Sequence, residues 1–189
     1  MAQLDTIYIK HHTIETDRLL LRPVTLNDAK DMYEYASDEQ TVFYVFKQIH
    51  QSVEDTEDNI VAHFLKNPIG KYGIEVKETG KMIGTIDLRV QEKLFQAEIG
   101  YIMNKAYHGK GYMTEAGVAL IKLGFETLGL ERIYALHDER NAVSGKVMQR
   151  LGMIKEGTLR HARKDHEGTY VNDVYYSILK KEYQANQSV

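Results

Sequence analysis

The most informative stretch of the chain reads Tyr107-His108-Gly109-Lys110-Gly111-Tyr112-Met113-Thr114-Glu115-Ala116. Glycine has no Cβ atom and tolerates positive φ, so Gly109 and Gly111 allow consecutive backbone N–H groups to converge on one point. An apolar helical pattern follows over about 112–128, and the start of such a helix adds unpaired N–H groups and a positive dipole end. The stretch therefore predicts either a cradle for a phosphate group or a tight turn that binds nothing.

Two common phosphate-binding patterns do not fit this stretch. A P-loop requires Ser or Thr after Gly-Lys, but Gly111 follows Lys110 here. A dinucleotide-binding fingerprint requires a third glycine where Thr114 stands. It also requires a ribose-binding acid about 20 residues further on, and Asp138 lies beyond that point. Both interpretations are weak.

Before this stretch the chain reads as strands with two helices near its beginning. Asn27 is expected to cap a helix over 28–33, and a Ser52-x-x-Asp55 capping box to open another that ends near 67. Alternating polarity and turn residues predict strands at 19–22, 72–77, 82–90 and 95–103. The last three form an expected antiparallel meander.

After the stretch, the pattern predicts a crossover and a closing hairpin. The buried helix over 112–128 connects the strand at 95–103 to one at 132–137, which should make these two strands parallel. Asn141 should cap a further helix with Val143 facing inward. Residues 153–163 and 169–179 then form the hairpin. The fold class is α+β, with one mixed, mostly antiparallel sheet flanked by helices.

Composition limits the classes of protein that need to be considered. The 189 residues, 43% hydrophobic and 27% charged, suit a single globular domain over 1–189 with a core at about 15–183. A net charge of −3 gives no general attraction to nucleic acid or to an anionic membrane. The absence of Cys excludes disulfides and thiolate sites. No apolar run suits a membrane span and no signal peptide is evident, which favours a cytoplasmic protein.

The glycine loop resembles the acetyl-coenzyme A pyrophosphate loop of the GNAT superfamily of N-acetyltransferases. From about Glu15 to Tyr183 the chain is similar to the branch of ribosomal-protein acetyltransferases typified by RimJ and RimL. The similarity rests on short segments in a fixed order: 15–23 (ETDRLLLRP), 98–101 (EIGY), 109–116 (GKGYMTEA), 141–144 (NAVS), 151–153 (LGM), 173–174 (DV) and 176–179 (YSIL). The superfamily usually has Gln or Arg three residues before the first glycine, where this chain has Ala106.

This resemblance implies an acyl-coenzyme A N-acyltransferase fold and an acetyl-coenzyme A-dependent N-acetyltransferase without a metal. An amine would attack the thioester directly and release coenzyme A. Glu98 would be the catalytic base, and Ser144 the acid or donor that meets the thiolate. The expected cofactor-binding residues are Ile102, Met103, His108, Gly109, Lys110, Gly111, Tyr112, Met113, Thr114, Asn141 and Lys146.

Several of these residues also have a purely structural interpretation. Glu98 suits a solvated strand face, Ile102 and Met103 suit a core, and Lys146 suits a surface. Asn141 caps a helix under either interpretation, and Ser144 is a plain first-turn residue if it has no catalytic role.

The resemblance leaves the acceptor open. It allows a protein N-terminus, including that of a ribosomal protein, or a small-molecule amine, and it allows a homodimer. Residues 41–46 would form part of an acceptor wall. Two alternatives come from other classes: a non-catalytic acyl-coenzyme A sensor domain and a nucleotide-binding protein.

Overall fold

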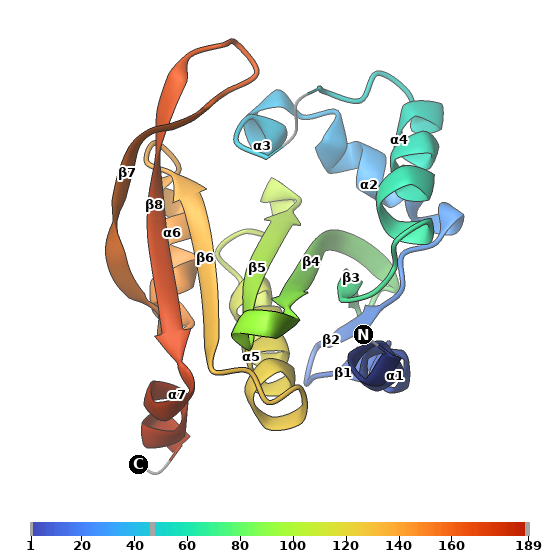
Figure 1. Ribbon diagram of the computed structural model, residues 1–189. Coiled ribbons are helices and arrows are strands. Elements are labelled where there is room, and N and C mark those ends of the chain that lie inside the picture. The colour runs from blue at the N-terminus through green and yellow to red at the C-terminus, as the bar shows by residue number, and fades with distance from the viewer. Residues whose placement is uncertain (1, 46–47, 188–189) are drawn as a thin grey trace. The chain divides into compact units, whose positions relative to one another are not determined.

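The computed structural model describes residues 2–45 and 48–187. Eight strands form one mixed sheet in the order β1-β2-β3-β4-β5-β6-β8-β7 (Figure 1). The strands are β1 Ile14–Glu15, β2 Leu19–Arg22, β3 Lys71–Val76, β4 Lys81–Gln91, β5 Gln96–Met103, β6 Arg132–Asp138, β7 Ile154–Lys164 and β8 Tyr170–Leu179. This sheet confirms the α+β class.

Within the described residues the helices are α1 Ala2–Lys10, α2 Ala29–Ala36, α3 Glu39–Val42, α4 Val53–Ile60, α5 Tyr112–Lys122, α6 Ala142–Arg150 and α7 Lys180–Gln187. Helices α4 and α5 each continue into a π-helical turn, at Val61–Leu65 and Leu123–Thr127. None of these helices combines the length and the apolar character that crossing a membrane would require. The chain divides into two compact units, residues 1–87 with 101–119 and residues 88–100 with 120–189.

The first unit contains an antiparallel succession of strands. Strand β2 pairs with both β1 and β3, and β3 pairs with β4. Helices α2 and α4 pack together through a core that includes Met32, Tyr35, Ile60 and Met82 (Figure 1). Burying such side chains contributes roughly 1.5–3 kcal/mol each to folding. This core fixes the strands that precede the glycine loop.

The start of α2 differs from the prediction that Asn27 would cap it. Thr25 occupies the capping position with extended backbone angles, and a single 3₁₀ turn, Leu26–Asp28, leads into the helix. The carboxylate of Asp28 accepts hydrogen bonds from Thr25 N at 2.7 Å and from the Arg22 guanidinium. Asp28 therefore combines a helix cap with an ion pair, whereas Asn27 is exposed. The predicted Ser52 cap of α4 is confirmed, since Ser52 Oγ accepts from Asp55 N.

The second unit confirms the predicted parallel pair of strands and the closing hairpin. Strands β5 and β6 are parallel, with Ala97 opposite Ile133. Strand β8 pairs antiparallel with both β6 and β7, which makes the long hairpin visible in Figure 1. Helix α6 is capped by Asn141 as expected. The prediction that Val143 faces inward is wrong, because its side chain is 59% exposed.

Candidate functional site

The glycine loop lies between β5 and α5 in the first unit. Lys105–Tyr107 form one 3₁₀ turn, and His108 then extends the chain into Gly109. Gly109 and Gly111 have φ of +76° and +81°, a region that L side chains rarely adopt. A Cβ atom at Gly109 would meet nothing within 4 Å, so the backbone angle and not lack of space requires glycine there. Both glycines thus adopt the positive φ that the residue type permits.

The backbone donors of this loop are unused. In the part of the chain that the structure describes, no protein group accepts a hydrogen bond from the N–H groups of residues 109–114, and Glu115 N is the first to bond, to Gly111 O at 3.0 Å. The first N–H groups of a helix have no acceptor within the helix, and the two left-handed glycines add further free donors in front of them. Consecutive free N–H groups at a helix start make an anion-binding arrangement.

An ion pair from the beginning of the chain holds the loop. Arg18 Nε donates to Glu115 Oε2 at 2.7 Å, and Arg18 Nη1 donates to the carbonyl oxygen of Lys110 at 3.0 Å. The guanidinium carbon lies 4.5 Å from the ring centroid of Tyr112. Thr16 Oγ1 and Arg18 N both donate to Glu115 Oε1, at 2.6 and 2.8 Å. The loop and the first turn of α5 are therefore tied to residues 16–18.

These contacts determine the ionisation of Glu115. Burial raises the pKa of its carboxyl group, but the hydrogen bonds from Thr16 and Arg18 lower it by more, so the pKa lies below the ordinary value. Glu115 is thus a carboxylate at neutral pH, and Arg18 balances its charge. Sequence reasoning did not assign Arg18 a role at the loop, although the segment 15–23 that carried the family resemblance contains it.

The end of strand β5 approaches β4 unusually closely in the first unit. A Cβ atom at Gly84 would collide with the carbonyl oxygen of Ile102 and lie 2.8 Å from Met103 Cα. Asn104 N donates to Ile83 O at 2.8 Å just beyond this point. His108 Nε2 lies 3.0 Å from the carbonyl oxygen of Met103 and, because a carbonyl only accepts, must donate to it. Gly84, which the sequence analysis missed, therefore permits the placement of Ile102 and Met103.

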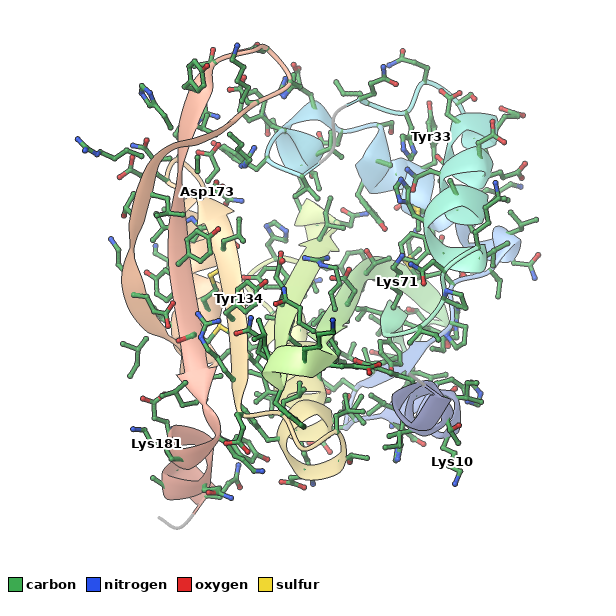
Figure 2. The ribbon with its side chains drawn as sticks, in the orientation of Figure 1. Lys10, Tyr33, Lys71, Tyr134, Asp173 and Lys181 are labelled. Carbon is green, nitrogen blue, oxygen red and sulfur yellow. The ribbon has the colours of Figure 1, made fainter. Side chains whose placement is uncertain are left out.

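Glu98 lies on the part of β5 that belongs to the second unit. Its carboxylate accepts from Arg89 Nη2 at 2.6 Å and from Tyr134 Oη at 3.3 Å (Figure 2 labels Tyr134 on β6). Gln91 Nε2 donates to the same tyrosine oxygen at 2.8 Å. Burial and the charge of Glu98 raise the pKa of Tyr134, which stays neutral. Glu98 is therefore a member of a hydrogen-bonded group rather than a solvated carboxylate on its own.

The first turn of α6 carries the other residues predicted for the second unit. Asn141 Oδ1 accepts from Ser144 N at 3.3 Å, which confirms the cap. Gly145 is buried, and a Cβ atom at this position would lie only 2.9 Å from His137 Nε2. The buried His137 ring contacts Tyr176 and, through Nδ1, the carbonyl oxygen of Asp138. Close packing of α6 on β6 thus explains a glycine in a helical turn. Lys146 is exposed.

The predicted site residues thus fall into two groups. The loop residues 108–114 gather in the first unit with Ile102 and Met103, and Lys110 Nζ lies over the Tyr107 ring at 5.0 Å from its centroid. The second unit holds Glu98, Asn141, Ser144 and Lys146.

A small cavity lies near the expected acceptor wall. It has a volume of about 400 Å³ and is lined by Glu39, Gln40, Phe43 and Tyr44 in the first unit. The rings of Phe43 and Tyr44 meet edge to face, with centroids 5.0 Å apart. The predicted wall at residues 41–46 includes Phe46, which lies outside the described residues. Two aromatic rings and a carboxylate suit an organic cation.

Comparison with known proteins agrees with this geometry. The family model described as acetyltransferase (GNAT) domain matches residues 18–154. The N-acetyltransferase p20 of Bacillus licheniformis is 35% identical over 176 residues, covering 90% of this chain and 98% of that protein. The ribosomal-protein-serine acetyltransferase of Escherichia coli K12 is 29% identical, covering 86% and 90%. A crystal structure of a GNAT-family acetyltransferase from Bacillus anthracis superposes with a TM-score of 0.80 at 29% identity, covering 89% and 99%.

The match over most of the chain shows that it belongs to the GNAT acetyltransferase family. The chain is an N-acetyltransferase, and enzymes of this family transfer the acetyl group of acetyl-coenzyme A to an amine.

Proposed function

We propose that the loop 109–114 binds the diphosphate of acetyl-coenzyme A and that the acceptor is a cationic amine. The observation that supports the first part is the run of free backbone N–H groups around two left-handed glycines at the start of α5. Hydrogen bonds from N–H groups to a charged acceptor contribute about 1.5–3 kcal/mol each. Because Ala106 offers no side chain to the phosphates, backbone donors and Lys110 supply the binding.

The reaction needs one proton acceptor and one proton donor. The ammonium group of the acceptor loses a proton to Glu98, directly or through water, and the amine nitrogen then attacks the thioester carbonyl carbon. The C–N bond forms and the C–S bond then breaks. The Ser144 hydroxyl gives a proton to the departing thiolate, which leaves as coenzyme A thiol. Ser144 is reprotonated, directly or through water, by the second proton that the nitrogen loses on becoming an amide. Backbone groups of Ile102 and Met103 bind the pantetheine arm, and a Met103 N–H is the oxyanion donor. Asn141 and Lys146 complete the cofactor contacts.

Charge favours a cationic acceptor. Residues 28–58 contain nine Asp and Glu against two Lys. Bases outside this segment pair with Asp28, Asp31, Glu34 and Asp38, so the negative charge that faces solvent comes from the other acids. Glu39 of the cavity is exposed, and so are Glu54, Glu57 and Asp58 on α4. A negative surface concentrates cationic partners and speeds their association. A polyamine or a basic N-terminal segment of a ribosomal protein has this chemistry, and a ribosomal protein is the substrate class that the E. coli relative's name states.

The direct test is release of coenzyme A from acetyl-coenzyme A with a panel of acceptors. We expect turnover with a polyamine or with a basic N-terminal peptide, and little with a neutral amine of the same length. Replacing Glu39 with Gln should raise the KM for the cationic acceptor without changing the KM for acetyl-coenzyme A. Tight binding of acetyl-coenzyme A with no turnover on any amine would instead indicate a sensor. Thermal stabilisation of the protein by ATP or NAD but not by coenzyme A would contradict the assignment of this site to coenzyme A.

Glu98→Gln should lower kcat about tenfold. The amide keeps the shape of the side chain but cannot accept the proton, while a water route still operates, so the loss should fall below the ~10²–10⁴-fold typical of general acid–base groups. Kinetics between pH 6 and 10 should show the deficit shrinking as pH rises, because more of the acceptor amine is then already neutral. Arg89→Gln, which removes the partner of Glu98 but keeps the carboxylate, is the matched control. Equal kcat for E98Q and the parent at every pH would remove Glu98 from the mechanism.

Ser144→Ala should slow acetyl transfer by a similar factor with less than a twofold change in the KM for acetyl-coenzyme A. The hydroxyl is proposed to act only on the thiolate that forms during the reaction, and the Asn141 cap uses the backbone N–H of Ser144, which the variant retains. Steady-state kinetics would check this. An unchanged kcat with a raised KM would assign Ser144 to cofactor binding alone.

A further inference from the structure

We propose that Arg18 is a positioning residue that presets the glycine loop for the diphosphate and cancels the charge of Glu115. The inference rests on the proposed function of the loop. Arg18 comes from the segment before β2, 92 residues away from Lys110 in the sequence, yet it contacts the loop and the first turn of α5 at three places. These are the Lys110 carbonyl oxygen, the Tyr112 ring and the Glu115 carboxylate.

The bond to the Lys110 carbonyl sets the orientation of a peptide plane. The Lys110–Gly111 peptide bond is trans, so its C=O and the N–H of Gly111 point in opposite directions. Because the guanidinium holds the carbonyl oxygen at 3.0 Å, the Gly111 N–H faces away from Arg18. Gly109 and Gly111 have no side chains that could fix the orientation of this peptide plane by packing. Arg18 thus selects the orientation in which the Gly111 donor is available to an anion.

The pair with Glu115 has an electrostatic consequence. Glu115 lies in the first turn of α5, within one turn of the free N–H groups. A lone carboxylate there would repel a diphosphate, and its exposed fraction of 18% leaves it only partly screened by water. Arg18 supplies the compensating charge through a hydrogen bond of 2.7 Å, and the pair is anchored by Thr16. Loss of Arg18 therefore releases the peptide plane and exposes the carboxylate charge at once.

Two acetyl donors separate positioning from general damage. Acetyl-coenzyme A carries the diphosphate, whereas S-acetyl-pantetheine lacks it. For Arg18→Gln we expect the KM for acetyl-coenzyme A to rise about tenfold with kcat within twofold of the parent, and kcat/KM with S-acetyl-pantetheine to stay within twofold. Adding Glu115→Gln to Arg18→Gln should recover about threefold in that KM, because the uncompensated charge is removed. Arg18→Lys keeps a charge but not the forked contact, so it should lie between the parent and Arg18→Gln.

Arg160→Gln serves as the control for loss of one positive charge, since Arg160 is an exposed residue of β7. It should leave the KM for both donors unchanged. An equal loss with both donors for Arg18→Gln would show that Arg18 only supports the fold, and no loss with either would also overturn the proposal. A parent enzyme that uses S-acetyl-pantetheine as well as acetyl-coenzyme A would instead refute the diphosphate site, and so the proposed function on which this inference rests.

Discussion

Replacing both Gly109 and Gly111 with Ala should raise the Kd for acetyl-coenzyme A at least about 100-fold. Both residues have φ near +80°, where a Cβ atom costs roughly 1–2 kcal/mol per residue. The loop is exposed and can relieve this cost by moving to negative φ, which would turn its N–H groups away from their common point. Losing two hydrogen bonds to a charged acceptor, at about 1.5–3 kcal/mol each, corresponds to more than a 100-fold loss of affinity.

The chain offers a matched control for this pair of substitutions. Gly80 and Gly168, in the turns of the β3–β4 and β7–β8 hairpins, have φ of +67° and +82°. As at Gly109, a Cβ atom there would meet nothing within 4 Å. The variant Gly80→Ala/Gly168→Ala should lose up to about 2–4 kcal/mol of stability, with unchanged affinity for acetyl-coenzyme A. Calorimetric titration with acetyl-coenzyme A and urea unfolding would measure the two effects separately.

Equal affinities in the two double variants would mean that left-handed glycines in general, and not this loop, set ligand binding. An unchanged Kd in the loop variant would refute the assignment of the diphosphate to residues 109–114.

The sequence predicts the sheet and the loop well because both depend on local signals. Period-two alternation, hairpin turns and the long apolar helix each lie within about 20 residues, and their order already implies the parallel pair of β5 and β6. The glycine spacing of the loop likewise reports a backbone conformation that few other residues tolerate. These elements required no knowledge of tertiary contacts.

The features that sequence reasoning missed depend on contacts across the chain. The partner of Arg18 lies 97 residues away at Glu115, and neither residue indicates the other by its spacing. Thr25, and not Asn27, caps the 3₁₀ turn that leads into α2, and Asp28 in that turn also forms an ion pair with Arg22 that the sequence pattern does not indicate. Val143 fits an inward helical pattern, but the close packing of Gly145 on His137 turns it toward solvent. The polar C-terminal segment also forms α7, where Tyr183 is anchored by Glu126.

Replacing Gly84 with Val should lower the free energy of unfolding by about 4 kcal/mol, near the upper limit for single substitutions. The new Cβ atom would collide with backbone atoms, Ile102 O and Met103 Cα, and not with a flexible side chain that could move away. Overpacking against atoms that cannot rotate away forces the end of β5 to move. Gly84→Ala should already show most of the loss, since the first carbon causes the collision.

Gly157→Val is the comparison for this substitution. Gly157 lies in β7, a Cβ atom there would meet nothing within 4 Å, and valine suits a strand, so the free energy of unfolding should change by less than about 0.5 kcal/mol. Urea unfolding of both variants measures the difference. If Gly84→Val is as stable as Gly157→Val, the close approach of β4 to Ile102 and Met103 does not exist in solution. In the folded fraction of Gly84→Ala, a displaced β5 end should raise the Km for S-acetyl-pantetheine and acetyl-coenzyme A alike. A rise with both donors would indicate damage at Ile102 and Met103, the proposed contacts of pantetheine. Damage at the glycine loop should instead affect only acetyl-coenzyme A, because S-acetyl-pantetheine lacks the diphosphate.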